Sequence, residues 1–195
     1  MTIAVAGSTG GIGSAVVEAA RRRGCTVVEI NRGEYAERRL FSDGAGPFDA
    51  VVFAIGTCPV APLLKTDDQM FAETIRVNCT MFLRLVREVV ESRLYAPGAK
   101  FVAVSSVSAV EGWAGGAAYC ASKGALSAMC RALSCELAPR GISVAALEPR
   151  YVATKMFERG AMRMGVPASQ AMSPESFAEQ VLDAAGVRGE DKEEE

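Results

Sequence analysis

Residues 2–23 read TIAVAGSTGGIGSAVVEAARRR and contain the three parts of a nucleotide-binding unit. The run 2–6 is short, apolar and partly β-branched, as in a central parallel strand. A glycine-rich segment follows at 7–13, and the apolar spacing of 14–23 is helical. Glycines allow a sharp turn and a close approach of the backbone to a pyrophosphate, and a helix N-terminus adds N–H donors. In this context the stretch predicts the first unit of a dinucleotide-binding fold.

Strands and helices continue to alternate along the chain. We expect further buried strands at 25–30, 49–56, 101–104 and 142–147, with a remnant strand at 39–42. Helices are expected at 66–89, where Thr66 opens a capping-box pattern, at 118–137 and at 173–185, where Ser173 precedes a proline. This alternation predicts a three-layer α/β fold, a Rossmann-like doubly wound parallel sheet of about six strands.

Composition restricts the class of protein. The 195 residues suit one domain over 1–187, followed by an acidic tail at 188–195. Six dispersed cysteines form no CxxC pair and are expected as reduced core residues, and the absence of histidine excludes histidine-based triads and most zinc sites. The net charge of −2 and dispersed basic residues predict no nucleic-acid surface. No apolar run reaches roughly 18 residues and no signal segment is present, so a cytoplasmic, membrane-free protein is expected.

A second segment carries candidate catalytic groups. Residues 101–123 read FVAVSSVSAVEGWAGGAAYCASK, with Tyr119 and Lys123 four residues apart and therefore on one helical face. A free phenol, with a pKa of about 10, is a poor acid or base near neutrality, and a nearby cation lowers that pKa. Ser106, just past the expected strand, can bring a hydroxyl to the same place. The segment thus offers a proton donor, a group that tunes it and a hydrogen-bond donor for a substrate oxygen.

This segment resembles the active site of the short-chain dehydrogenase/reductase family. The resemblance rests on SSVSA at 105–109, Gly112 and YCASK at 119–123, and on the GxxxGxG spacing of 7–13. It extends over roughly residues 2–185. It implies an NADP(H)-dependent oxidoreductase that interconverts a carbonyl and a secondary alcohol by hydride transfer, with the catalytic set Ser106, Tyr119, Lys123 and Asn78.

The resemblance also implies a role for each catalytic residue. Tyr119 donates a proton to the developing alkoxide, Ser106 hydrogen-bonds that oxygen, and Lys123 lowers the pKa of the tyrosine and binds the ribose hydroxyls. Asn78 disturbs its helix and holds a water that links the lysine to solvent. The alternative for this asparagine is a surface or capping position. The substrate is a small carbonyl compound, and a 3-oxoacyl thioester, a steroid-like ketone, a sugar and a polyketide all remain open.

Cofactor contacts follow from the same resemblance. In this fold an acidic residue at the end of the second strand binds the ribose hydroxyls, whereas a basic one favours a 2′-phosphate. Because Asn31–Arg32 stands there, NADP(H) is predicted over NAD(H), the alternative being that Arg32 is an ordinary loop cation. Asp43 is a possible contact to the adenine amine. The implied cofactor-binding residues are Gly7, Thr9, Gly11, Ile12, Gly13, Asn31, Arg32, Asp43, Gly56, Tyr119, Lys123, Pro149 and Thr154.

Several features depart from the family pattern. The Asn-Asn-Ala-Gly motif reads FAIG at 53–56, the segment 31–49 is short, the final strand is absent, and Arg150 replaces a glycine. If that position needs a positive φ, Arg150 is strained; otherwise the loop has shifted and Arg150 contacts an anionic substrate or the cofactor. These departures keep a second hypothesis open, a non-catalytic NADP(H)-binding regulatory or assembly protein. A Rossmann-like domain with coincidental motifs is the third.

Two further expectations concern the surface. The methionine-rich stretch 157–172 is expected to be a mobile substrate lid, unless it packs on the core. In the family, the helices that carry the equivalents of Asn78 and Tyr119 form a four-helix dimer interface, so the resemblance implies a homodimer. The missing final strand argues against a tetramer.

Overall fold

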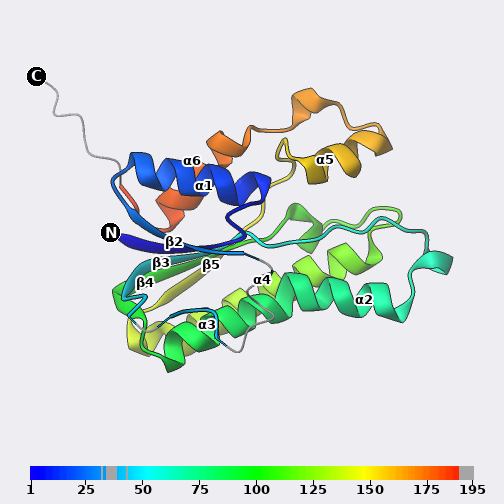
Figure 1. Ribbon diagram of the computed structural model, residues 1–195. Helices are drawn as coiled ribbons and strands as arrows, with labels where there is room; N and C mark the ends of the chain where they lie inside the picture. Colours follow the sequence, from blue (N-terminus) through cyan, green and yellow to red (C-terminus); the bar gives the residue numbers. More distant parts are fainter. Residues whose placement is uncertain (32, 34–38, 43, 189–195) are drawn as a thin grey trace, which may run out of the picture.

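Five parallel strands form the centre of the protein, in the order β2-β1-β3-β4-β5 (Figure 1). The computed structural model describes residues 1–31, 33, 39–42 and 44–188. The strands are β1 (Thr2–Ala6), β2 (Thr26–Ile30), β3 (Phe48–Phe53), β4 (Tyr95–Val104) and β5 (Ser143–Leu147). Because the chain winds outward from β1 in both directions, the sheet is doubly wound, which confirms the predicted fold class.

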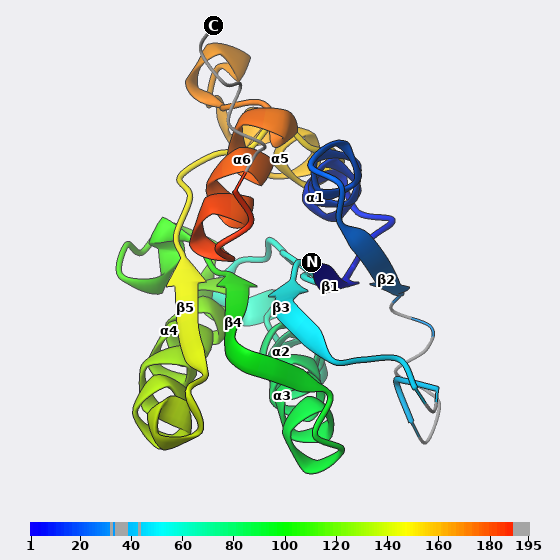
Figure 2. The same cartoon turned by 90° about the vertical axis from the view of Figure 1, so that its left-hand side faces the viewer.

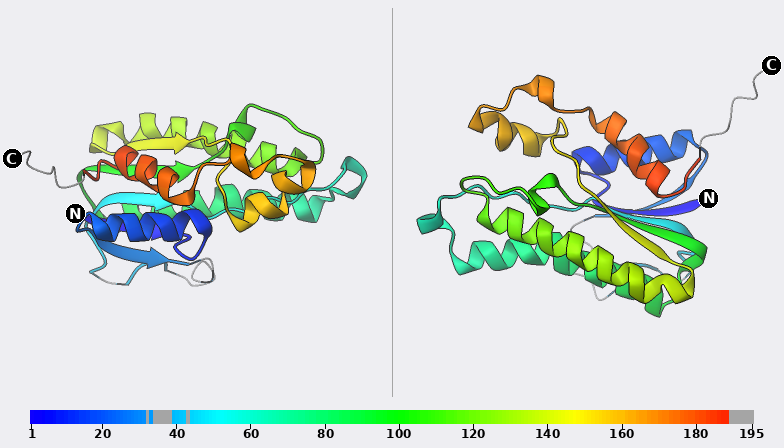
Figure 3. Two further views of the ribbon diagram at one scale, coloured as in Figure 1. Left: turned by 90° about the horizontal axis from the view of Figure 1, so that it is seen from above. Right: turned by 180° about the vertical axis from the view of Figure 1, so that it is seen from behind.

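Helices cover both faces of the sheet (Figure 2). On one face lie α1 (Gly11–Arg22) and α6 (Pro174–Ala184), and on the other α2 (Asp68–Ile75), α3 (Met81–Glu91) and α4 (Ala117–Leu137). The short helix α5 (Lys155–Arg159) lies beyond the carboxyl ends of the strands (Figure 3). The result is a single three-layer domain.

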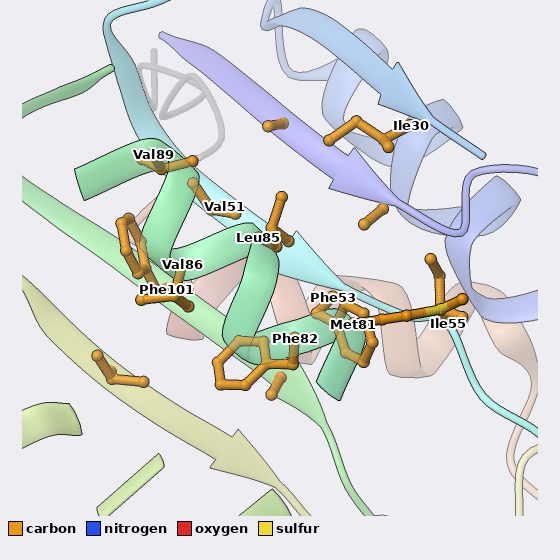
Figure 4. Close-up of a cluster of buried hydrophobic side chains, with 14 of the residues drawn as sticks. Ile30, Val51, Phe53, Ile55, Met81, Phe82, Leu85, Val86, Val89 and Phe101 are labelled. Carbon is orange, nitrogen blue, oxygen red and sulfur yellow. The ribbon is translucent and has the colours of Figure 1, made fainter. Parts of the chain in front are cut away.

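Side chains of successive strand residues enter two separate cores. Ile3 and Val5 of β1 pack on the side of α1 and α6, whereas Ala4 and Ala6 join the core beneath α3. Figure 4 shows the second core, where the rings of Phe53 and Phe82 lie 5.4 Å apart between centroids. Burial on both faces explains why these strands read as nearly continuous apolar runs.

The predicted remnant strand at 39–42 does not form, so the described part of the chain has five strands rather than about six. The backbone N–H groups of Leu40 and Phe41 donate to the Glu88 carboxylate of α3 at 2.6 and 3.1 Å. Both side chains are buried in the core. The Glu88 carboxylate therefore accepts the backbone hydrogen bonds that a neighbouring strand would otherwise accept.

The helix predicted at 66–89 consists of three pieces. A π-helical turn, Arg76–Thr80, separates α2 from α3. The N-cap of α2 is Asp67, whose side chain accepts from the Met70 N–H at 2.8 Å. The Thr66 hydroxyl instead donates to the Ala61 carbonyl. The helix thus begins one residue later than the capping-box pattern predicts.

The C-terminal part largely follows the sequence. Ser173 caps α6 by accepting from the Ser176 N–H, and Pro174 occupies the first helical position, as predicted. Residues 157–172 form the end of α5 and two short 3-10 turns, with Phe157 buried. In the described residues no strand follows β5, which forms one edge of the sheet. The predicted acidic tail lies outside the described residues from 189 onward.

Within the described residues, no helix combines the length and apolarity needed to cross a membrane.

Candidate active site

A cavity of about 950 Å³ opens at the carboxyl ends of β1, β3, β4 and β5. It spans the point between β1 and β3 where the winding of the sheet reverses direction, the usual ligand site of open α/β sheets. Ten of the predicted site residues line it: Gly7, Thr9, Gly11, Ile12, Gly56, Ser106, Tyr119, Lys123, Pro149 and Thr154. The fold therefore brings the glycine-rich turn and the Ser-Tyr-Lys set to one place, although 93 residues separate Gly13 from Ser106.

Of the other predicted residues, Gly13 and Asn31 do not line the cavity. Gly13 packs beneath the turn, where an added Cβ would lie 2.0 Å from the Gly7 carbonyl oxygen. Asn31 accepts a hydrogen bond from the Ser8 hydroxyl at 2.9 Å, which joins the end of β2 to the glycine turn. Arg32 and Asp43 lie outside the described residues, so their predicted cofactor contacts stay predictions.

The glycine-rich turn forms a cradle without side chains at the start of α1. Gly7 has a φ of +91°, and a Cβ there would lie 2.9 Å from the backbone carbon of Ala54. Gly10, the N-cap of α1, provides no side-chain hydrogen bond, and the first residues of the helix line the cavity. The free N–H groups of a helix N-terminus suit a diphosphate. These residues thus fit the diphosphate of a nicotinamide dinucleotide.

Ser106 and Tyr119 meet in the cavity because β4 ends at the same edge of the sheet at which α4 begins. Ser106 is extended at the end of β4, and its Oγ accepts from the Ser108 N–H at 3.1 Å. The Ser106 hydroxyl also hydrogen-bonds the Tyr119 side chain. The Nζ of Lys123 lies 5.7 Å from the centroid of the Tyr119 ring, which confirms that the two side chains share one helical face.

Burial dominates the electrostatics of this site. Desolvation raises the pKa of Tyr119 well above its ordinary value, with a smaller contribution from Cys58 and an opposing one from the hydrogen bond to Ser106. Desolvation also lowers the pKa of Lys123 to about 8. The Lys123 ammonium donates to the Val104 carbonyl at 2.8 Å. Burial sets the direction of the shift in Tyr119, and the predicted lowering of the phenol pKa by Lys123 stays a prediction.

Asn78 is fully buried in the π-helical turn, which excludes the surface alternative. Its Oδ1 accepts from the Thr57 N–H at 2.8 Å, and its Nδ2 donates to the Thr57 carbonyl and to the Ser122 hydroxyl. A Cβ placed on Gly56 would lie 3.6 Å from Asn78 Oδ1 and 3.7 Å from Lys123 Nζ. The asparagine thus joins the loop after β3 to α4 beside the lysine, and its water-binding role stays a prediction.

Arg150 is not strained. Among the described residues other than glycine, Arg93 alone has a positive φ, so the strain alternative is wrong. The two terminal nitrogens of Arg150 donate to the Glu111 carboxylate at 2.6 and 2.9 Å, and both residues line the cavity. No local pattern indicates this pair, because its members are 39 residues apart in two loops.

Two further cavity residues were not assigned from the sequence. Trp113 lies with its ring centroid 6.3 Å from that of Tyr119, and its Nε1 donates to the Ser108 hydroxyl. Cys58 follows β3 and also lines the cavity. Burial raises the pKa of its thiol to about 11, so Cys58 is a neutral group near the phenol.

A nucleotide-binding fold with a serine, tyrosine and lysine at one cavity defines an oxidoreductase class. Comparison with known proteins identifies it: residues 38–185 match the family model described as enoyl-(acyl carrier protein) reductase. The chain belongs to the short-chain dehydrogenase/reductase family.

Curated relatives cover nearly the whole chain at low identity. The 3-oxoacyl-[acyl-carrier-protein] reductase FabG of Vibrio harveyi is 24% identical, with 95% of this chain and 92% of the relative aligned. The acetoacetyl-CoA reductase of Allochromatium vinosum is 24% identical, with 93% and 89% aligned.

Solved structures share the fold. A short chain dehydrogenase family protein from Francisella tularensis superposes with a TM-score of 0.78 at 20% identity, over 94% of this chain and 90% of the other. Actinorhodin polyketide ketoreductase, solved with NADPH, gives a TM-score of 0.78 at 22% identity, over 95% and 90%. The 4-hydroxyisoleucine dehydrogenase, complexed with NADH, gives 0.74 at 21% identity, over 92% and 88%.

Proposed function

We propose that this protein is an NADP(H)-dependent reductase of ketones, of the 3-oxoacyl type, with Ser106, Tyr119, Lys123 and Asn78 as its catalytic set. The observation that carries the proposal is the meeting of Ser106 and Tyr119 beside Lys123 in the cavity that also holds the glycine cradle. Dinucleotide binding alone needs neither the serine nor the tyrosine. The names of the two curated relatives, which concern a 3-oxoacyl and an acetoacetyl thioester, support the substrate type.

Each side chain has a distinct task in the reductive direction. A bound reduced dinucleotide supplies hydride to the substrate carbonyl carbon. Ser106 donates a hydrogen bond to the carbonyl oxygen and holds it beside the Tyr119 hydroxyl, which transfers its proton as the oxygen gains charge. The raised pKa of Tyr119 keeps the phenol protonated until that moment. Lys123 binds the ribose hydroxyls, and Asn78 holds the water that returns the proton.

The preference for NADP(H) rests on the sequence at the end of β2. Asn31 stands at the position where an acidic residue would favour NAD(H), and Arg32 follows it. The solved relatives named above include one with NADPH and one with NADH, so both cofactors occur on this fold. The basic residue decides our proposal in favour of NADP(H).

The first experiment is a fluorescence titration of the purified protein with NADPH and NADH in parallel. Tight binding with preference for NADPH supports the cradle and Arg32. Absence of binding for both cofactors would contradict the proposal and favour a partner or scaffold protein.

A second experiment tests the catalytic assignment with Tyr119→Phe. This variant removes the proton donor, whose loss costs about 10² to 10⁴ in rate, while the glycine cradle stays intact. We expect turnover of a ketone to fall by that factor and NADPH affinity to change little. Tyr95→Phe, which removes a phenol hydroxyl in β4 outside the cavity, is the matched control. Equal activity of the Tyr119→Phe variant would refute the assignment.

We also propose a homodimer through α2, α3 and α4, which share one face of the sheet (Figure 1). Phe71 of α2 and Leu83 of α3 are 42% and 43% exposed, and a second subunit on these helices would cover such apolar surface. The mass measured by light scattering tests this homodimer.

A cytoplasmic location accompanies the proposal, because free thiols such as Cys79 and Cys130 persist in a reducing compartment.

A further inference from the structure

An ion pair connects two loops of the active-site cavity. Glu111 lies in the loop between the 3-10 turn Val107–Ala109 and α4, on the chain segment that carries Ser106 and Tyr119. Arg150 follows Pro149 in the loop after β5. Both side chains line the cavity that Ser106 and Tyr119 also line.

The pair has the geometry of carboxylate recognition. Nη1 of Arg150 donates to Oε2 of Glu111 at 2.9 Å, and Nη2 donates to Oε1 at 2.6 Å. Two parallel bonds of this kind are how a guanidinium selects a planar carboxylate. The Glu111 side chain therefore occupies the place that another carboxylate would take.

Replacing Glu111 by another carboxylate on Arg150 costs little free energy. The side chains of Arg150 and Glu111 are 57% and 47% exposed, and exposed ion pairs contribute little to stability. Glu111 can turn to water when a competing anion arrives. The charged lining residues in the described part of the chain are Glu111, Lys123, Arg150 and Lys155, so cations outnumber the carboxylate in the cofactor-free cavity.

We propose that Arg150 is a specificity residue that binds the carboxylate of an oxo-acid substrate, and that Glu111 occupies this site until the substrate displaces it. The inference rests on the proposed reductase function and narrows its substrate to an oxo acid with a free carboxylate, in place of the thioester that the names of the two curated relatives suggest. The competing interpretation of the same geometry is a clasp between two loops, which would act on every substrate alike.

The test compares acids with their own esters. Acetoacetate and levulinate are assayed with NADPH beside methyl acetoacetate and methyl levulinate, on the full chain and on the variants Arg150→Gln, Glu111→Gln and Arg140→Gln. Arg140 is an exposed arginine outside the cavity and serves as the matched control. In parallel, fluorescence of Trp113, the single tryptophan of the chain, reports binding of each compound without turnover.

An exposed charge-assisted pair is worth about twofold to fivefold in affinity, so Arg150→Gln should raise KM for the acids by about that factor and leave the esters unchanged. Glu111→Gln should lower KM for the acids and leave the esters unchanged, and Arg140→Gln should change neither. Equal changes for acids and esters, or no change, would overturn the inference in favour of a clasp.

The two measurements separate the two proposals. If every variant reduces esters and acids with equal KM, the reductase proposal stands and the carboxylate site is refuted. If the acids bind in a way that depends on Arg150 but no compound is reduced, the carboxylate site stands and the reductase proposal is refuted.

Discussion

The buried ammonium of Lys123 predicts how stability changes with pH. Its pKa in the folded protein is about 8, below the ordinary value of 10.5, because burial removes water from the charge. Below pH 8 both folded and unfolded states are protonated, and the folded state carries the full cost of burial. Between these two values the folded state loses its proton first, the unfolded state binds more protons, and stability rises with pH.

The expected size follows from the two pKa values. One pKa unit corresponds to about 1.4 kcal/mol, and integration from about pH 7 to about pH 9 gives a rise of about 1.3 kcal/mol in the free energy of unfolding. The thiols of Cys58, Cys79 and Cys130 have raised pKa values and act with the opposite sign as the pH approaches their ordinary value of 9.0. The lysine contribution is therefore the difference between the wild-type protein and a variant without Lys123, in which the thiol contributions cancel.

The assay is urea unfolding of the cofactor-free protein at both ends of that window. Lys123→Met removes the titrating group, so the wild-type protein should gain about 1.3 kcal/mol relative to this variant between the two pH values, although the variant also leaves the Val104 carbonyl without its donor at every pH. Lys65→Met, at an exposed lysine of the 3-10 turn Leu63–Lys65, should change with pH as the wild-type protein does. The reasoning fails if the wild-type protein and Lys123→Met change in parallel between the two pH values.

Two other substitutions test the cofactor cradle. Gly13→Ala places a Cβ 2.0 Å from the Gly7 carbonyl oxygen and should destabilise the protein by about 3 kcal/mol, a fall in Tm of about 6–12 °C. The control Gly112→Ala places a Cβ that meets nothing within 4 Å, so it should have little effect on stability. Thermal unfolding compares the two variants, and similar Tm values would contradict the packing. The double change Asn31→Asp with Arg32→Leu should shift the Kd ratio towards NADH, because it supplies an acceptor for the ribose hydroxyls and removes the basic group. An unchanged ratio would show that the end of β2 does not select the cofactor.

Much of the candidate site was predictable because its parts are local in sequence. The glycine turn follows a strand and opens a helix, so its place at the sheet edge follows from the order of elements. The shared face of Tyr119 and Lys123 follows from helical periodicity. Asn78 was predicted to disturb its helix, and the π-helical turn confirms this.

Other features depended on contacts between distant residues. The segment 39–42 has strand-like composition, but the Glu88 carboxylate of α3 takes its backbone donors, and no local pattern shows that. Arg150 suggested either strain or a ligand contact, and the partner that excludes strain, Glu111, lies in a different loop.

By itself, the sequence determined the fold class, the position of the glycine-rich turn and the candidate reactive side chains, because these depend on short-range spacing along strands and helices. The tertiary structure alone decided the electrostatic state of the site. Burial raises the pKa of Tyr119 and lowers that of Lys123, and burial is a sum over segments that the sequence keeps far apart.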